Sequence, residues 1–266
     1  MRKTTLLLFI GITMFANTVN SQCKLIKKRS YQDEYEIRNY DYDSQNRLIK
    51  VKTTYTNDNT LENYAISYSS SSGKSLSMKP LLDKSYPFSF VYRNDTLIRT
   101  EQKVEGFPHP NSNDYIYKDG KLSLIITKFD YMGRRLKALE TELFYEGNNV
   151  VKIISNDKEE EKRRVMFENV KYDTNKNWKA NNPFKAYVLA NFNGDYNFDE
   201  LLALSENNAV EYTLNDTFTF PVGEKNTNVK LSYEFDSKKR PSKIIDTRIV
   251  EGRTITTLES FDYSCQ

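Results

Sequence analysis

The stretch YDSQNRLIKV, Tyr42 to Val51, places an aromatic residue and an aspartate before three polar turn residues, and a base, a leucine and an alternating pattern after them. The same unit recurs in FDYMGRRL, Phe129 to Leu136, and in FDSKKRPSKI, Phe235 to Ile244. Glycine or asparagine in a tight turn accepts positive φ, and the aspartate accepts hydrogen bonds from backbone amides of the turn. The aromatic residue and the leucine face neighbouring strands, where cross-strand pairs stabilise a ribbon. The unit therefore predicts a β-hairpin and leaves no residue that needs a catalytic role.

Looser copies of this unit run along much of the chain at irregular spacings. They begin at Tyr68, Tyr92, Tyr117, Tyr131, Tyr145 and Tyr172. Apolar residues also alternate with polar ones at 121–129, 149–156 and 228–235, where β-branched and aromatic residues are common. The sequence therefore predicts an all-β, mainly antiparallel fold in which consecutive hairpins form one large curled sheet or barrel. Closure into a barrel would also remove the exposed edges of an open sheet.

One segment departs from the alternating pattern. NFDELLALSENN, Asn197 to Asn208, starts with an asparagine that can cap a helix, has acidic residues in its first turn and ends with two asparagines. It predicts one short helix near 197–208, within an irregular or helical insertion that covers 175–208.

The N-terminus has the layout of a secretory signal peptide. A short basic head precedes the apolar run TLLLFIGITMFA, and Val19 and Ser21 suit the positions before a cleavage point. The apolar run is shorter than the about 20 residues of a membrane-spanning helix. We therefore expect a signal peptide at 1–21 and a single β-rich domain at 22–266. The mean hydropathy of −0.71 is that of a polar chain, so we expect a protein that is exported to the periplasm or to the cell surface and medium, and soluble after cleavage.

The two cysteines lie at the extreme ends of the expected mature chain. Lipidation of Cys23 is an alternative to simple cleavage, but Gln22 and Asn20 stand where a lipoprotein signal prefers a small residue and a leucine. Export would place Cys23 and Cys265 where disulfides persist. We expect a Cys23–Cys265 bridge, worth about 5 kcal/mol in the chain-entropy model, with two unrelated thiols as the alternative.

The charge is nearly balanced and interleaved. Loss of Arg2 and Lys3 with the signal peptide would lower the formal net charge from +3 to +1. A nucleic-acid-binding protein normally has a concentrated basic face, so we expect no nucleic-acid partner. No second hydrophobic segment follows the N-terminal one, so we expect no transmembrane segment in the mature chain.

The residues needed for common catalytic sites are scarce. His109 is the only histidine, and it lies in the proline-rich stretch GFPHPNSND. One histidine and two terminal cysteines cannot supply a zinc site, and no glycine-rich phosphate loop is present. Asp195, Asp199 and Glu200 could in principle form a carboxylate pair for glycoside hydrolysis, but they also fit a turn and the first turn of a helix. We predict a non-enzyme with no catalytic, cofactor-binding or metal-binding residues and no cofactor.

The repeated unit resembles the YD repeats of bacterial shell and wall-associated proteins, although the glycine-bearing second half of those repeats is missing here. The chain is more similar to secreted Bacteroidota proteins of unknown function that are described as having a porin-like fold. The stretches that carry this resemblance are NNPFKAY, Asn181 to Tyr187, and LSENNAVEY, Leu204 to Tyr212. The resemblance implies an antiparallel sheet curled into an open or closed barrel, and it implies no established activity. Many such relatives look lipidated, which this sequence does not.

A porin-like fold does not by itself imply a membrane-spanning barrel. A lipid-facing strand has an apolar outer face over about 10 residues, whereas lysines and acidic residues interrupt nearly every expected strand.

Two further residues are candidates for recognition or modification. Trp178 is the single tryptophan and could contact a ligand or a partner, although a core position would explain it as well. The sequence DTL, Asp95 to Leu97, resembles a Bacteroidota O-glycosylation motif and makes Thr96 a candidate acceptor.

Three functions follow from these observations. The first is a non-enzymatic cell-envelope binding protein that holds an apolar or glycan ligand in the interior or at the rim of the curled sheet. The second is a structural or interaction module with a solid core that binds another envelope protein. The third, ranked last, is a glycan hydrolase, which would need two facing acids in a cleft, one of them with a raised pKa.

Overall fold

The computed structural model describes residues 23–31, 35–55, 61–69, 74–80, 87–103, 106, 108–131, 135–157, 161–177, 179, 182–192, 198–216, 225–250 and 252–265. The expected signal peptide, 1–21, lies outside this part of the chain. Its processing and the expected boundary at residue 22 therefore stay predictions.

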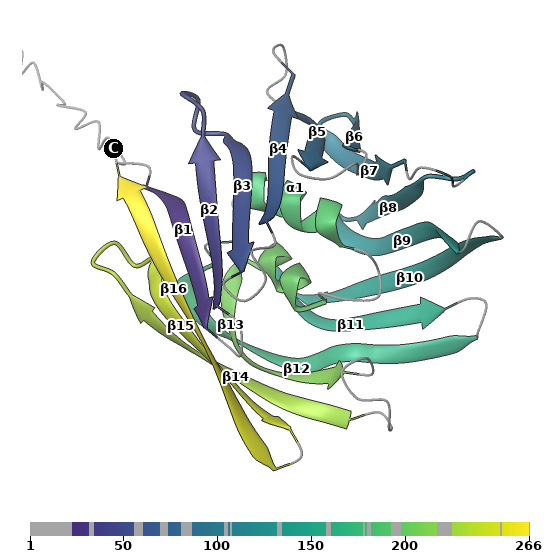
Figure 1. Cartoon of the computed structure of the whole chain (residues 1–266). Coiled ribbons are helices and arrows are strands. Elements are labelled where there is room, and N and C mark those ends of the chain that lie inside the picture. Colours follow the sequence, from purple (N-terminus) through teal and green to yellow (C-terminus); the bar gives the residue numbers. More distant parts are fainter. Residues whose placement is uncertain are drawn as a thin grey trace, which may run out of the picture.

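The described residues form sixteen strands and two helices (Figure 1). The strands are β1 (Cys23–Tyr31), β2 (Tyr35–Tyr42), β3 (Leu48–Tyr55), β4 (Leu61–Tyr68), β5 (Ser75–Pro80), β6 (Phe88–Arg93), β7 (Thr96–Gln102), β8 (Asn111–Lys118), β9 (Lys121–Tyr131), β10 (Arg135–Glu146), β11 (Asn149–Asp157), β12 (Lys162–Lys176), β13 (Asn207–Asp216), β14 (Lys225–Phe235), β15 (Pro241–Val250) and β16 (Arg253–Cys265). An α-helix, α1 (Asn182–Asn191), and a 3-10 helix, η2 (Phe198–Leu204), lie between β12 and β13.

The strands form a closed antiparallel barrel. Each strand pairs with its neighbours in sequence, and β1 pairs with β16 to close the sheet. In Figure 1 the first and last strands accordingly lie side by side. The expected all-β fold of consecutive hairpins is confirmed, and of the two expected forms, curled sheet and barrel, the protein adopts the closed barrel.

The turn of the opening motif is held by its aspartate. Asp43 Oδ1 accepts hydrogen bonds from the amides of Gln45 and Arg47, both at 2.9 Å, and Asp43 Oδ2 accepts one from Arg47 Nε at 2.7 Å. Asn46 has a φ of 65°, which asparagine tolerates better than most residues. The aspartate thus satisfies the amides that the turn leaves without a ladder partner.

The C-terminal copy of the motif folds in the same way. Asp236 Oδ1 accepts the amides of Lys238 at 2.8 Å and Arg240 at 3.0 Å, and Arg240 Nε donates to Asp236 Oδ2 at 2.8 Å. Lys239 takes the left-handed position with a φ of 58°. Because the aspartate fixes the turn, this copy forms without glycine or asparagine at that position.

The middle copy, FDYMGRRL, also forms a hairpin. Tyr131 pairs with Arg135, and Asp130 pairs with Leu136, across β9 and β10.

Two shorter turns have a different backbone conformation, in which both central residues have positive φ. These are Asn94 and Asp95, at 45° and 66°, and Asp119 and Gly120, at 51° and 76°. Such two-residue turns match the twist of antiparallel strands.

The aromatic residues of the motif form a belt at one end of the barrel. Every even-numbered strand has a tyrosine near its C-terminal end that is partly buried against the core, and we call this set the tyrosine belt: Tyr42, Tyr68, Tyr92, Tyr117, Tyr145, Tyr172, Tyr233 and Tyr263. The even-numbered strands of an up-and-down barrel all end at the same rim, so residues spread over the whole chain meet there.

Five hydroxyl groups of this belt donate to backbone carbonyls earlier in the chain, those of Tyr42, Tyr68, Tyr172, Tyr233 and Tyr263. Tyr68 donates to the carbonyl of Leu48 at 2.6 Å, and Tyr263 donates to that of Pro241 at 2.8 Å. The base that precedes the acceptor lies over the same ring. The guanidinium of Arg47 is 4.7 Å from the centre of the Tyr68 ring, and that of Arg240 is 4.4 Å from Tyr263. In these two units the turn is therefore joined to the following strand by both contacts.

The two helices lie inside the barrel and plug it. Val188, Leu189 and Ala190 of α1, and Leu201 and Leu202 of η2, are buried in the same core cluster as the inner faces of the strands. The plug touches several parts of the wall, since Tyr187 of α1 packs edge-on against Tyr64 of β4, and η2 contacts β11 and β12. Figure 1 shows α1 enclosed between β4 and the wall formed by β8 and β9.

The expected helix near 197–208 is confirmed as the 3-10 helix η2, which stops at Leu204 because Asn207 already begins β13. The helix α1 was not predicted as a separate element. It has Pro183 in its first turn, which suits a helix start. Its sequence PFKAYVLA is apolar almost all round, as expected of an enclosed helix, and it therefore shows no helical periodicity.

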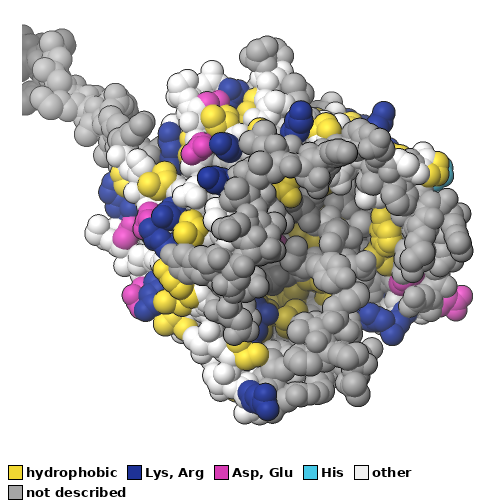
Figure 2. Space-filling model, viewed as in Figure 1, with side chains coloured by type: hydrophobic (Ala, Val, Ile, Leu, Met, Phe, Trp, Pro, Cys, Tyr) yellow, Lys and Arg dark blue, Asp and Glu magenta, His cyan; other side chains and the backbone are white. Residues whose placement is uncertain are grey.

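The outer wall of the barrel is charged and paired across strands. Arg29 bonds to Asp262 at 2.5 Å between β1 and β16, and Lys243 bonds to Glu234 at 2.9 Å between β15 and β14. Basic and acidic side chains are mixed over the face that carries β1 and β16 (Figure 2). The apolar faces of the strands thus point to the plug, and many polar faces point outward.

The hydrogen bonds of Asp43 predict a pH-dependent contribution to stability. Burial would raise the pKa of Asp43, but the amide and guanidinium of Arg47 and the amide of Gln45 outweigh it and lower the pKa. A lowered folded pKa stabilises the fold above the ordinary value of about 4, and this contribution is lost as the pH falls through the folded pKa. We expect Asp43→Asn to reduce the free energy of unfolding at pH 7 by about 1 kcal/mol, and the difference from wild type to shrink below about pH 4, as measured by urea unfolding.

Asp95→Asn is the matched control for this prediction. Asp95 also lies in a hairpin turn, but its side chain is 86% exposed and its ion pair is with Lys74. Exposed ion pairs contribute little, so Asp95→Asn should change stability by less than about 0.5 kcal/mol. Equal losses in Asp43→Asn and Asp95→Asn would contradict the role assigned to the turn aspartate.

Candidate functional site

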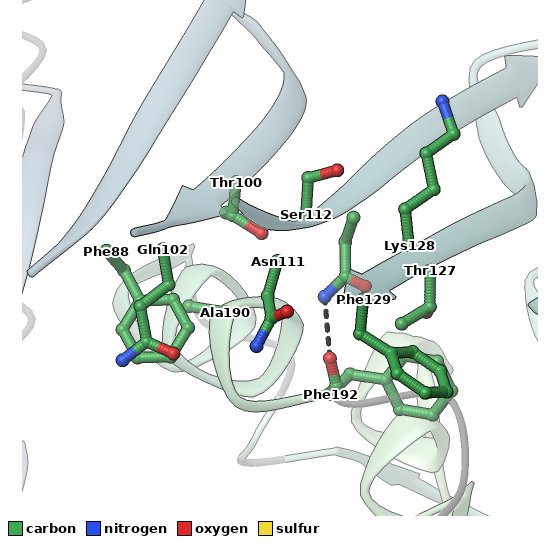
Figure 3. Close-up of a pocket in the computed structure, with 11 residues that line it drawn as sticks. Phe88, Thr100, Gln102, Asn111, Ser112, Thr127, Lys128, Phe129, Ala190 and Phe192 are labelled. Carbon is green, nitrogen blue, oxygen red and sulfur yellow. Dashed lines mark hydrogen bonds between the residues drawn. The ribbon is translucent and has the colours of Figure 1, made fainter. Parts of the chain in front are cut away.

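A cavity of about 310 Å³ lies between the barrel wall and the plug. It is lined by residues from β6 to β9 and from the end of α1 (Figure 3): Phe88, Thr100, Gln102, Asn111, Ser112, Asn113, Thr127, Lys128, Phe129, Ala190 and Phe192. The described part of the plug leaves this space beside Ala190 and Phe192 unfilled.

The strand register places a polar row on the inner wall of this cavity. Thr100 of β7 is the register partner of Asn113 of β8, and Asn113 is in turn the partner of Thr127 of β9. All three side chains are buried. Two residues further along the strands, Phe88 pairs with Gln102. Polar groups therefore form one side of the cavity, and phenylalanine rings flank them.

The polar row also holds the end of the plug. Asn113 Nδ2 donates to the carbonyl of Phe192 at 2.6 Å, which is dashed in Figure 3, and to that of Leu189 at 3.4 Å. The hydroxyl of Tyr115 donates to the carbonyl of Leu189 at 2.8 Å. The last carbonyls of a helix have no partner within the helix, so these side chains satisfy the C-terminal end of α1 inside the barrel.

Two atoms of this row remain without a protein partner. Within the described part of the chain, Asn113 Oδ1 and Thr127 Oγ1 are buried and make no hydrogen bond. The side chain of Asn113 cannot turn its amide group around without losing both donated bonds to α1. A buried polar group without a partner costs about 1–3 kcal/mol, so these two atoms need an explanation.

The described lining of the cavity carries almost no charge. Lys128 is the one charged residue among the described residues that line it. Its ammonium group extends away from the cavity (Figure 3) and bonds to Asp114 at 2.9 Å. Burial alone would raise the pKa of Asp114, but Arg99 and Lys128 outweigh it and lower the pKa. The charge of Lys128 is therefore paired on the outer wall.

A second polar cluster joins the plug to the opposite wall. Lys28 of β1 bonds to Glu259 of β16 at 2.5 Å, and Lys179 lies 3.7 Å from Glu200 of η2. Attraction to Lys179, with contributions from Lys28 and Arg38, outweighs burial and lowers the pKa of Glu200 to about 2. A carboxylate held in its charged form cannot serve as the protonated acid of a glycoside hydrolase, which needs one acid with a raised pKa beside an ionised carboxylate.

The structure places the residues named from the sequence in different regions. Cys23 and Cys265 are direct register partners where β1 meets β16. Thr96 is exposed at the start of β7, and His109 is exposed in the segment before β8. Trp178 and Asp195, and the side chain of Asp199, lie outside the described residues. None of the named residues that are described lines the large cavity.

Sequence reasoning missed Asn113, Thr127 and the phenylalanines of the cavity. One signal was present: Asn113 occupies an inward position on the strand SNDYIY, where alternation calls for an apolar residue. Without the register of β7 to β9, however, a polar residue at such a position cannot be told from one on the outer face.

Within the described chain, no three metal-ligating side chains gather, and no helix is long and apolar enough to cross a membrane.

Comparison with known proteins shows which solved structures have a similar fold. No model of a known protein family matches the sequence, and no curated relative matches it. Among solved structures, a porin-like protein from Bacteroides uniformis ATCC 8492 has a TM-score of 0.55 at 10% identity, over 91% of this chain and 96% of that chain. A porin-like protein from Bacteroides vulgatus ATCC 8482 has a TM-score of 0.53 at 14% identity, over 90% of this chain and 98% of that chain. The chain therefore has the fold of these porin-like proteins, and identities this low carry no further conclusion.

The pairing of Glu200 predicts how firmly the plug is held. The low pKa stabilises the fold above about pH 4.5, and this contribution is lost as the pH falls towards 2. The Glu200 side chain is 33% exposed, and solvent screening reduces its energy. We expect Glu200→Gln to lower the free energy of unfolding at pH 7 by about 1–2 kcal/mol and to make the pH dependence between 4.5 and 2 less steep than in wild type, as measured by urea unfolding across that range.

Glu206→Gln serves as the control for Glu200→Gln. Glu206 follows η2, is exposed and accepts a hydrogen bond from Asn148 at 2.9 Å. Its substitution should change stability by less than about 0.5 kcal/mol. The role of Glu200 would be refuted if its substitution left both the stability and its pH dependence unchanged.

Proposed function

We propose that this chain is an exported, non-enzymatic barrel protein that binds a small ligand in the cavity between β6–β9 and the plug. The observation that carries the proposal is the cavity itself, which is lined by phenylalanine rings and by polar side chains. Ligand sites are typically concave and mostly apolar, with a few placed polar groups. The porin-like neighbours have no activity in their descriptions and are compatible with this reading.

We propose the location of the protein from the charged side chains of its outer wall. The outer wall carries ion pairs such as Arg29–Asp262 and Lys243–Glu234. A basic side chain at the middle of a bilayer costs a transmembrane barrel about 2–4 kcal/mol. This favours a barrel that works in water within the cell envelope or outside the cell over one that spans the bilayer. Signal cleavage before Gln22, with lipidation of Cys23 as the alternative, remains part of this proposal.

A transport pore and an interaction module both fit less well. A sixteen-stranded porin has an open aqueous channel, whereas here α1 and η2 occupy the lumen. An interaction module requires a filled interior, and the plug fills much of it but leaves the cavity beside Phe192.

A contact of Trp178 with a ligand and glycosylation of Thr96 stay predictions. Peptide mapping of the native protein would test the glycosylation of Thr96.

We also propose that Cys23 and Cys265 form a disulfide. Direct partners in an antiparallel ladder have Cα atoms about 4.5–5.5 Å apart, which falls in the range that a disulfide spans. The bridge would fasten the strand pair that closes the barrel. We expect the intact mass to rise by two hydrogen atoms on reduction, and Cys265→Ser to lower the free energy of unfolding by about 2–4 kcal/mol. An unchanged mass on reduction would exclude the bridge, and a lipid adduct on Cys23 would show the alternative processing.

Native mass spectrometry of the protein purified from its own envelope tests the binding function. We expect a bound mass that is lost on denaturation. Gln102 is half-buried, lines the cavity and faces Phe88, so Gln102→Trp should block the site and remove most of the bound mass.

Glu101→Trp is the matched control, because Glu101 is the next residue of β7 and bonds to Arg99 at 3.2 Å on the other face of the strand. This variant should retain the bound mass. The binding function would be contradicted by an apo mass in wild type, or by equal occupancy in Gln102→Trp and Glu101→Trp.

A further inference from the structure

Two amide side chains are the polar groups that the cavity wall presents to a ligand. Gln102 and Asn111 are register partners of β7 and β8, and both line the cavity and are half-buried. Figure 3 shows both amide groups extending from the strands toward α1. Two residues further along the strands, Asn113 is buried and already donates to α1. The cavity therefore offers a ligand a pair of neighbouring carboxamides on one wall.

A phenylalanine ring lies at each end of this amide pair. Phe88 is the register partner of Gln102 across β6 and β7. The register of β8 and β9 places Phe129 beside Asn111, and both rings line the cavity. The inner wall therefore carries a row in the order ring, amide, amide, ring.

The plug presents an apolar surface to this row. Ala190 and Phe192 are the described plug residues that line the cavity, and both are buried. A ligand therefore meets amide groups on one side and carbon on the described plug side. A flat heterocycle has this distribution, because its polar atoms lie at its edge and its faces are apolar. A sugar has hydroxyl groups around its whole ring, and each needs a partner when buried.

The carboxamide group favours a particular edge of such a ring. It has donor hydrogens on its nitrogen and acceptor lone pairs on its oxygen. Asparagine and glutamine accordingly bind the neighbouring donor and acceptor of adenine through both atoms at once, and aromatic side chains stack on the same kind of ring. The cavity of about 310 Å³ lies at the lower end of the usual range for small-ligand sites, which suits one small ring system.

From these contacts we infer that the cavity binds a flat nitrogen heterocycle that has a hydrogen-bond donor next to an acceptor at its edge. The carboxamides of Gln102 and Asn111 bind this edge, and the rings of Phe88, Phe129 and Phe192 contact the rest of the ligand. The inference rests on the proposed binding function and names its ligand class.

A probe series tests this class on the mature chain. The probes are adenine, purine, which has the same rings without the amino group, and methyl β-D-glucopyranoside, which is a sugar. Binding is measured by ligand-observed NMR and isothermal titration calorimetry. We expect adenine to bind at least about tenfold more tightly than purine, because purine lacks the donor of the edge. We expect no detectable binding of the sugar.

Asn111→Leu is the decisive variant. It replaces the amide with an apolar group of similar size at the half-buried first position of β8. We expect the affinity for adenine to drop about tenfold and the affinity for purine to change much less, so that the preference for adenine is lost. Circular dichroism and the melting temperature check the fold. If Asn111→Leu does not fold, Gln102→Met removes the other amide of the pair and is expected to lose the same preference.

Asn228→Leu is the matched control. Asn228 is an exposed asparagine on β14 that accepts a hydrogen bond from Thr213 at 3.4 Å, and it does not line the cavity. Its affinities for adenine and purine should equal those of wild type.

The outcomes separate the ligand class from the binding function. A preference for adenine that disappears in Asn111→Leu and persists in Asn228→Leu supports the inference, whereas a preference that persists in both variants overturns it. If purine or the sugar binds as tightly as adenine and Gln102→Trp blocks it, the cavity binds ligands but the class is wrong. If none of the probes binds to wild type, the ligand class is overturned, and an apo mass in the native protein would overturn the binding function as well.

Discussion

A closed sheet of sixteen strands encloses more space than its own side chains can fill, and the rest of this structure depends on that constraint. Barrels of about eight strands can be filled by inward side chains, whereas those of sixteen or more leave a lumen. Here the inner faces of the strands are apolar, as Val51, Ile125 and Val229 show by their complete burial. An open aqueous lumen lined by such residues would be unfavourable, so the barrel needs a plug.

The plug brings a second constraint, because helix ends carry backbone groups without partners. The carbonyls of Leu189 and Phe192 are satisfied by Asn113 and Tyr115 of β8. The charge of Glu200 of η2 is stabilised by Lys179 and by Lys28 and Arg38 of the wall. The inner wall must therefore be polar where the plug ends and where it carries charge, although it is apolar elsewhere. The candidate binding site lies at one of these polar places, beside Ala190 and Phe192.

The hairpins could be predicted from the sequence because their physics is local. Asp43 and Arg47 are four residues apart and determine their own turn, and the same holds for Asp236 and Arg240. The cavity could not be predicted, because its walls combine β6–β9 with the end of α1, which is more than fifty residues away in the chain. The charged candidates Asp199 and Glu200 drew attention as acids, yet the charge of Glu200 is neutralised by Lys179. The helix α1 escaped because a helix that is enclosed on all sides has no polar face to produce a period.

The sequence by itself determined that this chain is built from consecutive antiparallel hairpins, because short turn motifs, such as the aspartate and base at Asp43–Arg47 and Asp236–Arg240, specify hairpins within about ten residues. It also placed a helix between the strands that became β12 and β13. Only the tertiary structure decided that the sheet closes, since pairing of β1 with β16 joins the two ends of the chain. It also decided that the helical segment lies inside the barrel and that Asn113 and Thr127 face a shared cavity. These properties depend on register and closure across the whole sheet, which no local pattern encodes.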